Sequence, residues 1–292
     1  MHDESIDVGA VRLAVRRGGP DPTSAEAQRP VLLVHGLASN ARLWDGVAAR
    51  LGAAGHPVAA VDQRGHGLSQ APPDGYDTDT CADDLAELIT VLGWTGGLAP
   101  VVAGQSWGGN VVLSLAARHP GVAAIALVDG GWLRLAGRFQ SFEECWQVLA
   151  PPSFEGVQYA DLAARIAGSH TDWPAEGISG TLANLVELAD GGTRARLSRE
   201  HHRSIVHSLW LGDPRLHYPQ VAVPALLMPA GASVGSAAVD EAARLLPDSQ
   251  VSAYVGADHD LHAQHPARCA LDLHDLAVRA DARSPLPKEP AT

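Results

Sequence analysis

Residues 101–115 of the chain read V-V-A-G-Q-S-W-G-G-N-V-V-L-S-L, and the fold can be predicted outward from this stretch. A short apolar strand over 101–103 runs into a glycine-flanked serine, Ser106, and then into a helix over about 109–118. Because a sharp strand-to-helix turn leaves little room for side chains, the flanking glycines let the backbone bend and expose the Ser106 hydroxyl. The first N–H groups of the helix point at this hydroxyl and would stabilise a negative oxygen there. The setting of strand, turn and helix therefore indicates a nucleophilic serine.

The rest of the chain alternates strands and helices around this stretch. Continuous apolar runs typical of strands buried on both faces occur at 31–34, 58–61, 123–128 and 225–228, and residues 250–255 are predicted to form the last strand. Helical spacing occurs at 41–51, 79–92, 237–246 and 266–279. Residues 8–16 alternate apolar and polar side chains as a half-buried strand does. This order predicts an α/β fold, with a mostly parallel central sheet flanked by helices and joined by right-handed crossovers.

The alternation stops over residues 132–219. This segment contains helical patches such as 179–188 and four tryptophans, Trp132, Trp146, Trp173 and Trp210. An insertion of this size between two strands predicts a helical cap over the catalytic loops. The core is then 1–131 with 220–280, and 281–292 is predicted to be a disordered tail. The tryptophans are expected either to pack inside the cap or to line a substrate pocket.

The composition limits the possible partners. The 292 residues are 46% hydrophobic with a net charge of −12, which favours one α/β domain and argues against nucleic acid or an anionic membrane surface as the main partner. The first residues show no secretory signal and no apolar run could span a membrane, so we expect a cytoplasmic protein. Cys81, Cys145 and Cys269 are widely separated, lack metal-ligand spacing and are expected to be reduced thiols.

Four short motifs follow the predicted strands in a characteristic order. They are His35-Gly36, Asp62-x-Arg64-Gly65-x-Gly67, Gly104-Gln105-Ser106-Trp107-Gly108-Gly109 and Gly256-x-x-His259. In these motifs the chain resembles α/β-hydrolase-fold enzymes with a cap, over about residues 8–279. Epoxide hydrolases and haloalkane dehalogenases of this fold place Asp at the elbow. Serine at 106 therefore implies that no alkyl-enzyme ester forms.

The resemblance implies a role for each site residue. Ser106 is the nucleophile and His259, in the loop after the last strand, is the base that takes its proton. The backbone N–H groups of Leu37 and Trp107 form the oxyanion hole, since the fold uses the residue after the nucleophile and one in the loop after the strand at 31–34. His35 is expected to be a structural residue of that loop rather than a base.

The acidic member of the triad has several candidates in the sequence. Most relatives carry it after the strand that follows the cap, but residues 226–234 contain no carboxylate. Asp129, at the end of the strand before the cap, is the other position that this fold uses, and the order Ser106, Asp129, His259 fits the family. The alternatives are Asp240, Asp258, and an Asp129 that only caps its loop.

These roles imply a serine hydrolase that cleaves an ester, lactone or thioester of a hydrophobic small molecule through an acyl-enzyme, without a metal or organic cofactor. Trp132, Trp146, Trp173 and Trp210 are the candidate substrate contacts. Ser106-Trp107-Gly108 also resembles proline iminopeptidases, in which case Glu143-Glu144 would bind a free amine. A ligand-binding receptor on the same fold, and a cofactor-free oxygenase or cyclase, remain open. The sequence does not fix the oligomeric state.

Overall fold

The computed structural model describes residues 1–283, and its centre is an eight-stranded sheet formed within these residues. The strands lie in the order β1-β2-β4-β3-β5-β6-β9-β10. Their bounds are β1 His2–Val8, β2 Val11–Gly18, β3 Val31–Val34, β4 Val58–Val61, β5 Val101–Gln105, β6 Ala124–Val128, β9 Ala225–Met228 and β10 Ser249–Val251. Every neighbouring pair from β4 to β10 is parallel, whereas β2 pairs antiparallel with both β1 and β4.

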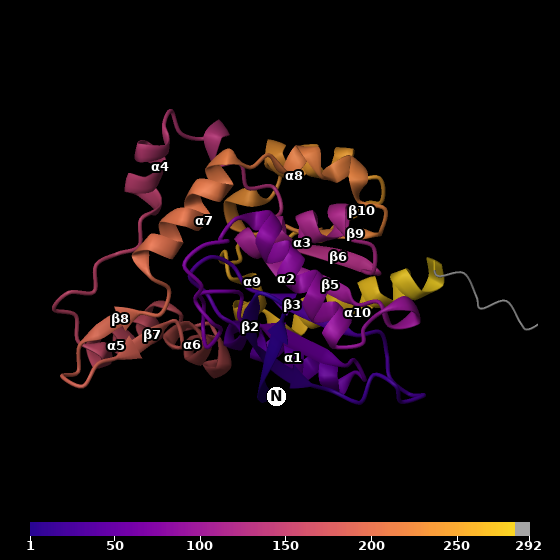
Figure 1. The fold of residues 1–292 in the computed structure, drawn as a ribbon, viewed down its shortest axis with the longest axis horizontal. Helices are drawn as coiled ribbons and strands as arrows, with labels where there is room; N and C mark the ends of the chain where they lie inside the picture. Colours follow the sequence, from indigo (N-terminus) through magenta and orange to yellow (C-terminus); the bar gives the residue numbers. More distant parts are fainter. Residues whose placement is uncertain (284–292) are drawn as a thin grey trace, which may run out of the picture.

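Helices cover both faces of this sheet (Figure 1). One face packs against α1 (Asp45–Ala53), α9 (Leu261–Gln264) and α10 (Pro266–Arg283), and the other against α2 (Thr78–Val91), α3 (Trp107–Arg118) and α8 (Ala237–Leu245). The strands supply a side chain to each face in turn. In β3, Leu32 and Val34 enter one core and Val31 and Leu33 the other, all fully buried. The predicted α/β fold with a mostly parallel sheet flanked by helices is confirmed.

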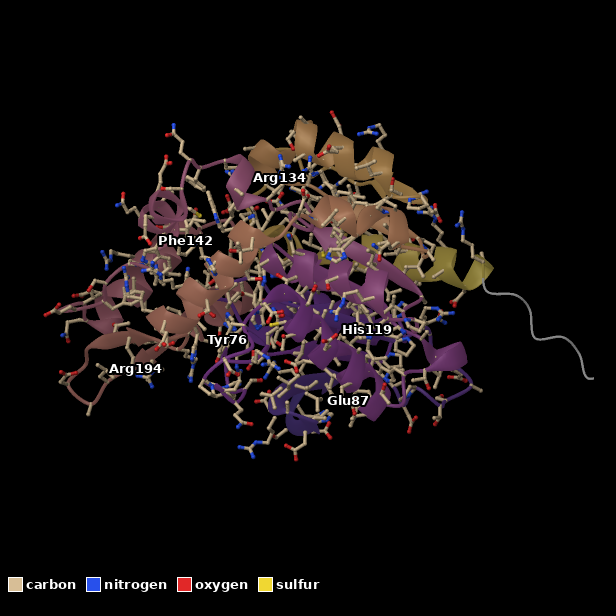
Figure 2. All side chains as sticks on the ribbon, turned by 45° about the horizontal axis from the view of Figure 1, so that its top comes forward. Tyr76, Glu87, His119, Arg134, Phe142 and Arg194 are labelled. Carbon is tan, nitrogen blue, oxygen red and sulfur yellow. The ribbon has the colours of Figure 1, made fainter. Side chains whose placement is uncertain are left out.

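Residues 132–219, which we call the inserted segment, lie between β6 and β9. Their elements are α4 (Phe142–Leu149), α5 (Tyr159–Ser169), α6 (Ala175–Leu182), β7 (Leu185–Glu187), β8 (Thr193–Ala195) and α7 (Arg199–Leu211). The segment lies to one side of the molecule: in Figure 2, Phe142 and Arg194 are on the left, away from His119 at the end of α3. The description of this segment as a helical cap over the catalytic loops stays a prediction.

The helix predicted over 179–188 is wrong in its second half. Helix α6 ends at Leu182, and β7 then pairs antiparallel with β8. The hairpin turn needs Gly191 in the left-handed region, at φ +80°, so that the Leu188 N–H can reach the carbonyl of Gly192. The pairing of β7 with β8 depends on contacts between residues up to ten positions apart, which helical spacing within 179–188 does not indicate.

Three predicted boundaries also differ from the structure. Residues 8–16 are not one strand, because Gly9 turns the chain at φ +69° and separates β1 from β2. The last strand, predicted over 250–255, ends at Val251, although the Tyr254 N–H still bonds to the carbonyl of Pro229. The predicted tail begins inside α10, which runs to Arg283, and its remainder lies outside the described residues.

The described residues bear on two further expectations. None of the helices within residues 1–283 is long and apolar enough to cross a bilayer. Cys81, Cys145 and Cys269 are buried and form no disulfide.

Candidate active site

The serine predicted as nucleophile lies at the tight turn between β5 and α3. Ser106 has φ 54° and ψ −123°, a conformation that a non-glycine residue adopts only when its surroundings impose it. Around this turn the closest neighbours are backbone atoms of adjoining segments. A Cβ added at Gly104 would clash with the carbonyl of Gly108, one at Gly108 with that of His35, and one at Gly130 with that of Ser106. Glycine is therefore required at all three positions for this turn to form.

Asp129 and His259 are brought into contact from distant parts of the chain. Asp129 follows β6 and is buried, and its Oδ2 lies 2.6 Å from Nδ1 of His259, in the loop between β10 and α9. A carboxylate can only accept, so Nδ1 carries the hydrogen and Nε2 is free to take a proton. Oδ1 of Asp129 accepts from the N–H of Ala230 at 3.0 Å. The carboxylate is thus held by the end of β9, the strand where the more usual acid would lie.

The two alternative acids lie elsewhere. Oδ2 of Asp258 accepts from Nε1 of Trp173 at 2.8 Å, which directs this carboxylate toward the inserted segment. Asp240 is in the first turn of α8. Of the three carboxylates considered, only Asp129 is hydrogen-bonded to His259 within residues 1–283.

Ser106 and His259 do not make a hydrogen bond within the described part of the chain. Their loops nevertheless lie against each other, because Nε2 of Gln105 donates to the carbonyl of His259 at 3.3 Å. Hydrogen bonds between nucleophile and base are often long before substrate binds. The structure therefore joins Asp129 to His259 and places the turn of Ser106 beside them.

The pKa of His259 is raised above its ordinary value of 6.5. Burial acts to lower it, but the hydrogen bond to Asp129 and the charges of Asp260 and Asp129 outweigh burial. A base must be neutral to accept a proton, so kcat/KM should fall as the pH falls through this raised pKa. We expect the acid limb of kcat/KM, measured from about pH 5 to 9, to have its midpoint above 6.5. Asp129→Asn should move this limb to lower pH, and an unmoved limb would show that another group controls it.

The predicted oxyanion donors lie on either side of Ser106. Trp107 is the first residue of α3, so its N–H has no acceptor within the helix. The N–H of Leu37 also has no partner among residues 1–283. The loop of Leu37 touches the serine, since a Cβ added at Gly36 would lie 2.9 Å from Cβ of Ser106.

A second loop, after β4, is hydrogen-bonded to the loop that carries Leu37 and holds it in place. Oδ1 of Asp62 accepts from the N–H of Ala41 at 2.7 Å, and the N–H of Gln63 donates to Nε2 of His35 at 3.0 Å. Nδ1 of His35 lies 2.7 Å from the carbonyl of Gly36. Both ring nitrogens of His35 are therefore occupied, in agreement with a structural role rather than that of a base.

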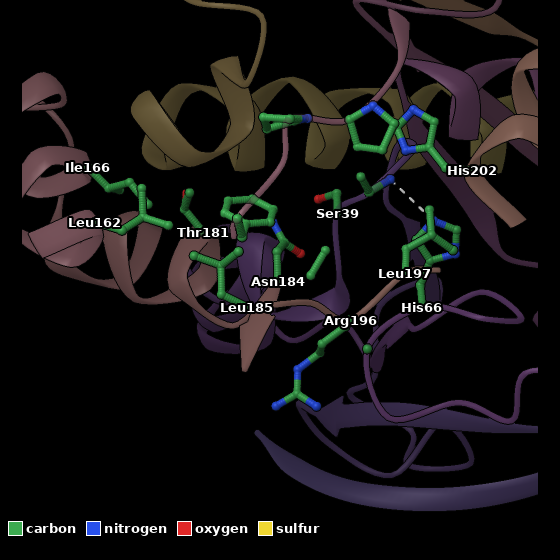
Figure 3. A pocket seen from close by; sticks show the side chains of 16 residues that line it. Ser39, His66, Leu162, Ile166, Thr181, Asn184, Leu185, Arg196, Leu197 and His202 are labelled. Carbon is green, nitrogen blue, oxygen red and sulfur yellow. Dashed lines mark hydrogen bonds between the residues drawn. The ribbon is translucent and has the colours of Figure 1, made fainter. Parts of the chain in front are cut away.

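A cavity of about 280 Å³ lies between this loop and the inserted segment (Figure 3). Its apolar wall includes Phe154, Leu162, Ile166 and Leu185 of the inserted segment. Its other wall includes Ala38, Ser39 and His66. Neither Ser106 nor His259 lines it. The cavity adjoins the oxyanion residues instead, because Ala38 follows Leu37 and the ring of His66 stacks on that of Trp107.

The four tryptophans singled out from the sequence do not line this cavity. Trp146 packs against His202 and lies under the guanidinium groups of Arg199 and Arg203. Trp210 contacts Phe142, and Trp173 holds Asp258. Trp132 is on the wall of a separate cavity beside α8. For Trp146, Trp173 and Trp210 these contacts are packing between elements. Their role as substrate contacts, like that of Trp132, stays a prediction, and the cavity residues are further candidates that the sequence did not single out.

Within residues 1–283, no group of three or more His, Cys, Asp or Glu side chains is arranged to hold a metal ion. The residues predicted for the site are a serine at a strained turn, a histidine hydrogen-bonded to a carboxylate, and two backbone N–H groups without an acceptor among the described residues.

Several known proteins resemble this chain in sequence and in fold. A family model described as the alpha/beta hydrolase fold matches residues 29–174. 2-(Acetamidomethylene)succinate hydrolase of Mesorhizobium japonicum is 30% identical over 265 residues, covering 89% of this chain and 90% of that protein. Pimeloyl-[acyl-carrier protein] methyl ester esterase of Neisseria meningitidis is 30% identical over 225 residues, covering 73% and 79%. A crystal structure of E-2-(acetamidomethylene)succinate hydrolase superposes with a TM-score of 0.75 at 26% identity, covering 94% and 98%.

Proposed function

Because the chain belongs to the alpha/beta hydrolase fold family, we propose that it is a serine hydrolase that cleaves an ester, lactone or thioester of a small hydrophobic molecule through an acyl-enzyme. The observation that carries this proposal is the 2.6 Å contact between Asp129 and His259, beside the strained turn of Ser106. A serine hydroxyl is a weak nucleophile at neutral pH and needs a base held in this way.

In the proposed reaction, Oγ of Ser106 attacks the substrate carbonyl while Nε2 of His259 takes its proton. The negative oxygen that forms accepts hydrogen bonds from the N–H groups of Leu37 and Trp107. The imidazolium is stabilised by Asp129 and gives its proton to the leaving group as the acyl-enzyme forms. Water, activated by the same histidine, then releases the acid and restores Ser106.

The charges around the cavity favour an uncharged substrate. Burial lowers the pKa values of His66 and His202, so both are neutral near pH 7. Arg196 is the one cationic side chain of the described cavity wall, and in Figure 3 its guanidinium points away from Ser39. The M. japonicum relative acts, by its name, on a substituted succinate, which has two carboxylates. We propose that this chain prefers neutral esters to such a dianion.

Two of the alternatives from the sequence, the iminopeptidase and the receptor, have weaker support. Glu143 pairs with Arg203 at 2.7 Å and Glu144 accepts from the N–H of Gln140, and neither lines the cavity, so neither is poised to bind a substrate amine there. A ligand-binding receptor would lack turnover, and the experiment below separates it from an enzyme.

The test is a panel of p-nitrophenyl esters of increasing chain length, assayed beside lactones and 2-(acetamidomethylene)succinate. We expect turnover of neutral esters, with kcat/KM rising from acetate to medium chains, and a much lower kcat/KM for the dianionic amide. Turnover of 2-(acetamidomethylene)succinate alone would show that this chain shares the relative's activity and would refute our substrate proposal. Tight binding of one ligand with no turnover of any activated ester would indicate a receptor.

Filling the cavity should change substrate preference. Leu162→Trp places a larger side chain on the apolar wall, so we expect kcat/KM for an octanoate ester to fall about tenfold more than for acetate, since displaced apolar contacts are worth about 1–3 kcal/mol. The matched control is Leu211→Trp, at a residue 71% exposed and outside this cavity. Equal losses of kcat/KM on both esters would show that the cavity does not bind the acyl chain of the substrate.

A further inference from the structure

His66 lies where the two predicted oxyanion residues meet the cavity, at a position to which no role is assigned above. Its Nε2 accepts from the N–H of Ala38, the residue after Leu37, at 3.2 Å (Figure 3). Its ring also stacks on the indole of Trp107, with centroids 5.7 Å apart and planes inclined by 29°. One buried side chain thus contacts the backbone beside one oxyanion donor and the side chain of the other.

We infer that His66 is a positioning residue that fixes the Leu37 and Trp107 N–H groups relative to each other. This inference rests on the proposed function, in which these two groups stabilise the oxyanion. His66 itself does not reach the reacting atoms. It acts through Ala38 and through the ring of Trp107.

The tautomer of His66 follows from its two hydrogen bonds. The Ala38 N–H can only donate, so Nε2 must carry a lone pair. Nδ1 then carries the hydrogen and donates to the carbonyl of Arg64 at 3.0 Å. Arg64 is itself fixed by two bonds of 2.7 Å to the buried Asp84 of α2. The acceptor that faces Ala38 is therefore held in place by a chain of contacts reaching the core.

The loop needs such an anchor because Ala38 is strained. Its φ of +56° lies in the left-handed region, which a non-glycine residue occupies only when neighbouring contacts impose it. The anchors on either side of the loop, at His35 and Ala41, do not bond to Leu37 or Ala38. The hydrogen bond to His66 is the anchor next to Leu37, so its loss would let the Leu37 N–H turn away from the oxyanion.

His66 also keeps its accepting form over the working pH range. Burial, followed by the neighbouring His35, lowers its pKa well below 6.5, and only the carbonyl of Arg64 acts in the other direction among the larger influences. A protonated ring would turn an N–H toward the N–H of Ala38. This histidine therefore remains an acceptor at the pH where His259 titrates.

The test uses a trifluoromethyl ketone that matches the preferred acyl chain and forms an oxyanion on Ser106. His66→Phe keeps a ring against Trp107 but removes the acceptor for Ala38, so we expect kcat to fall about tenfold with KM little changed, and Ki for the ketone to rise by a similar factor. His66→Gln, whose side-chain carbonyl can accept from Ala38, should recover most of both losses.

The matched control is His202→Phe. His202 is another buried histidine of the same cavity wall, but its Nε2 donates to the carbonyl of Leu149, and within residues 1–283 it makes no hydrogen bond to the loop that carries Leu37. We expect it to leave the ratio of ketone Ki to product Ki unchanged. The inference is overturned if both Phe variants raise this ratio equally, or if His66→Phe lowers only the melting temperature. Failure of a fluorophosphonate to label Ser106 would overturn the proposed function instead.

Discussion

Ser106→Ala is expected to lower kcat for ester hydrolysis by about 10⁶-fold, the loss seen when a triad enzyme loses its nucleophile. The hydroxyl is the atom that bonds to the substrate, and alanine leaves the turn between β5 and α3 intact because it adds no atom to the crowded backbone. Residual turnover would come from the oxyanion donors and from substrate binding. The measurement is kcat on the best p-nitrophenyl ester, together with Kd for its product.

The control for this variant is Ser114→Ala. Ser114 is on the same helix, α3, and its buried hydroxyl bonds to Asp79 at 2.6 Å, away from the site. This change should cost some stability and leave kcat near that of the wild type. Turnover of Ser106→Ala within tenfold of wild type would mean that another group attacks the substrate.

Asp129→Asn is expected to lower kcat by about 10⁴-fold, as it does when a serine protease loses its triad acid. Asparagine keeps the shape of the side chain, and its Oδ1 can still accept from the N–H of Ala230. Its amide then presents a donor to Nδ1 of His259, which favours the tautomer with the hydrogen on Nε2 and removes the base. Binding of a product analogue should change little, because the cavity is untouched.

Asp258→Asn is the matched comparison. Asp258 is adjacent to His259 in sequence but accepts from Trp173, a bond that asparagine can also accept. We expect its kcat to stay near the wild-type value. If Asp258→Asn or Asp240→Asn loses activity while Asp129→Asn does not, Asp129 only caps its loop and the assignment of the acid is wrong.

The parts of the site that could be predicted are those carried by local geometry. The elbow around Ser106 needs glycines at 104 and 108 whatever the remainder of the chain does, so a short pattern indicates it. The order of strands and helices follows from apolar runs that are buried on both faces. The sequence favours Asp129 as the acid, from its place at the end of a strand and from the lack of a carboxylate over 226–234. The contacts that hold it could not be predicted, because the Ala230 N–H and His259 lie 101 and 130 residues from Asp129.

What could not be predicted depends on contacts between distant segments. Strand β1 is exposed at five of its seven residues and alternates between buried and exposed side chains only over its last three, so its pairing with β2 defines most of it. The strands of the β7–β8 hairpin have three residues each and follow a helix directly, so they are too short for the two-residue alternation of a strand to be recognised. In the sequence His66 is only the variable residue between Gly65 and Gly67. No sequence pattern indicates that it contacts Ala38 and Trp107. The cavity residues likewise become visible only when the inserted segment is placed against the loop after β3.

The central claim, that Ser106 is the covalent nucleophile, is tested most directly by mass spectrometry after reaction with a fluorophosphonate. A serine activated by His259 should gain one phosphonyl group per chain, and peptide mapping should place it on Ser106. Ser106→Ala should gain none, and Ser114→Ala should be labelled like the wild type. A phosphonyl group mapped to any other residue, or ester hydrolysis that continues with Ser106 unmodified while the probe is in excess, would contradict the account.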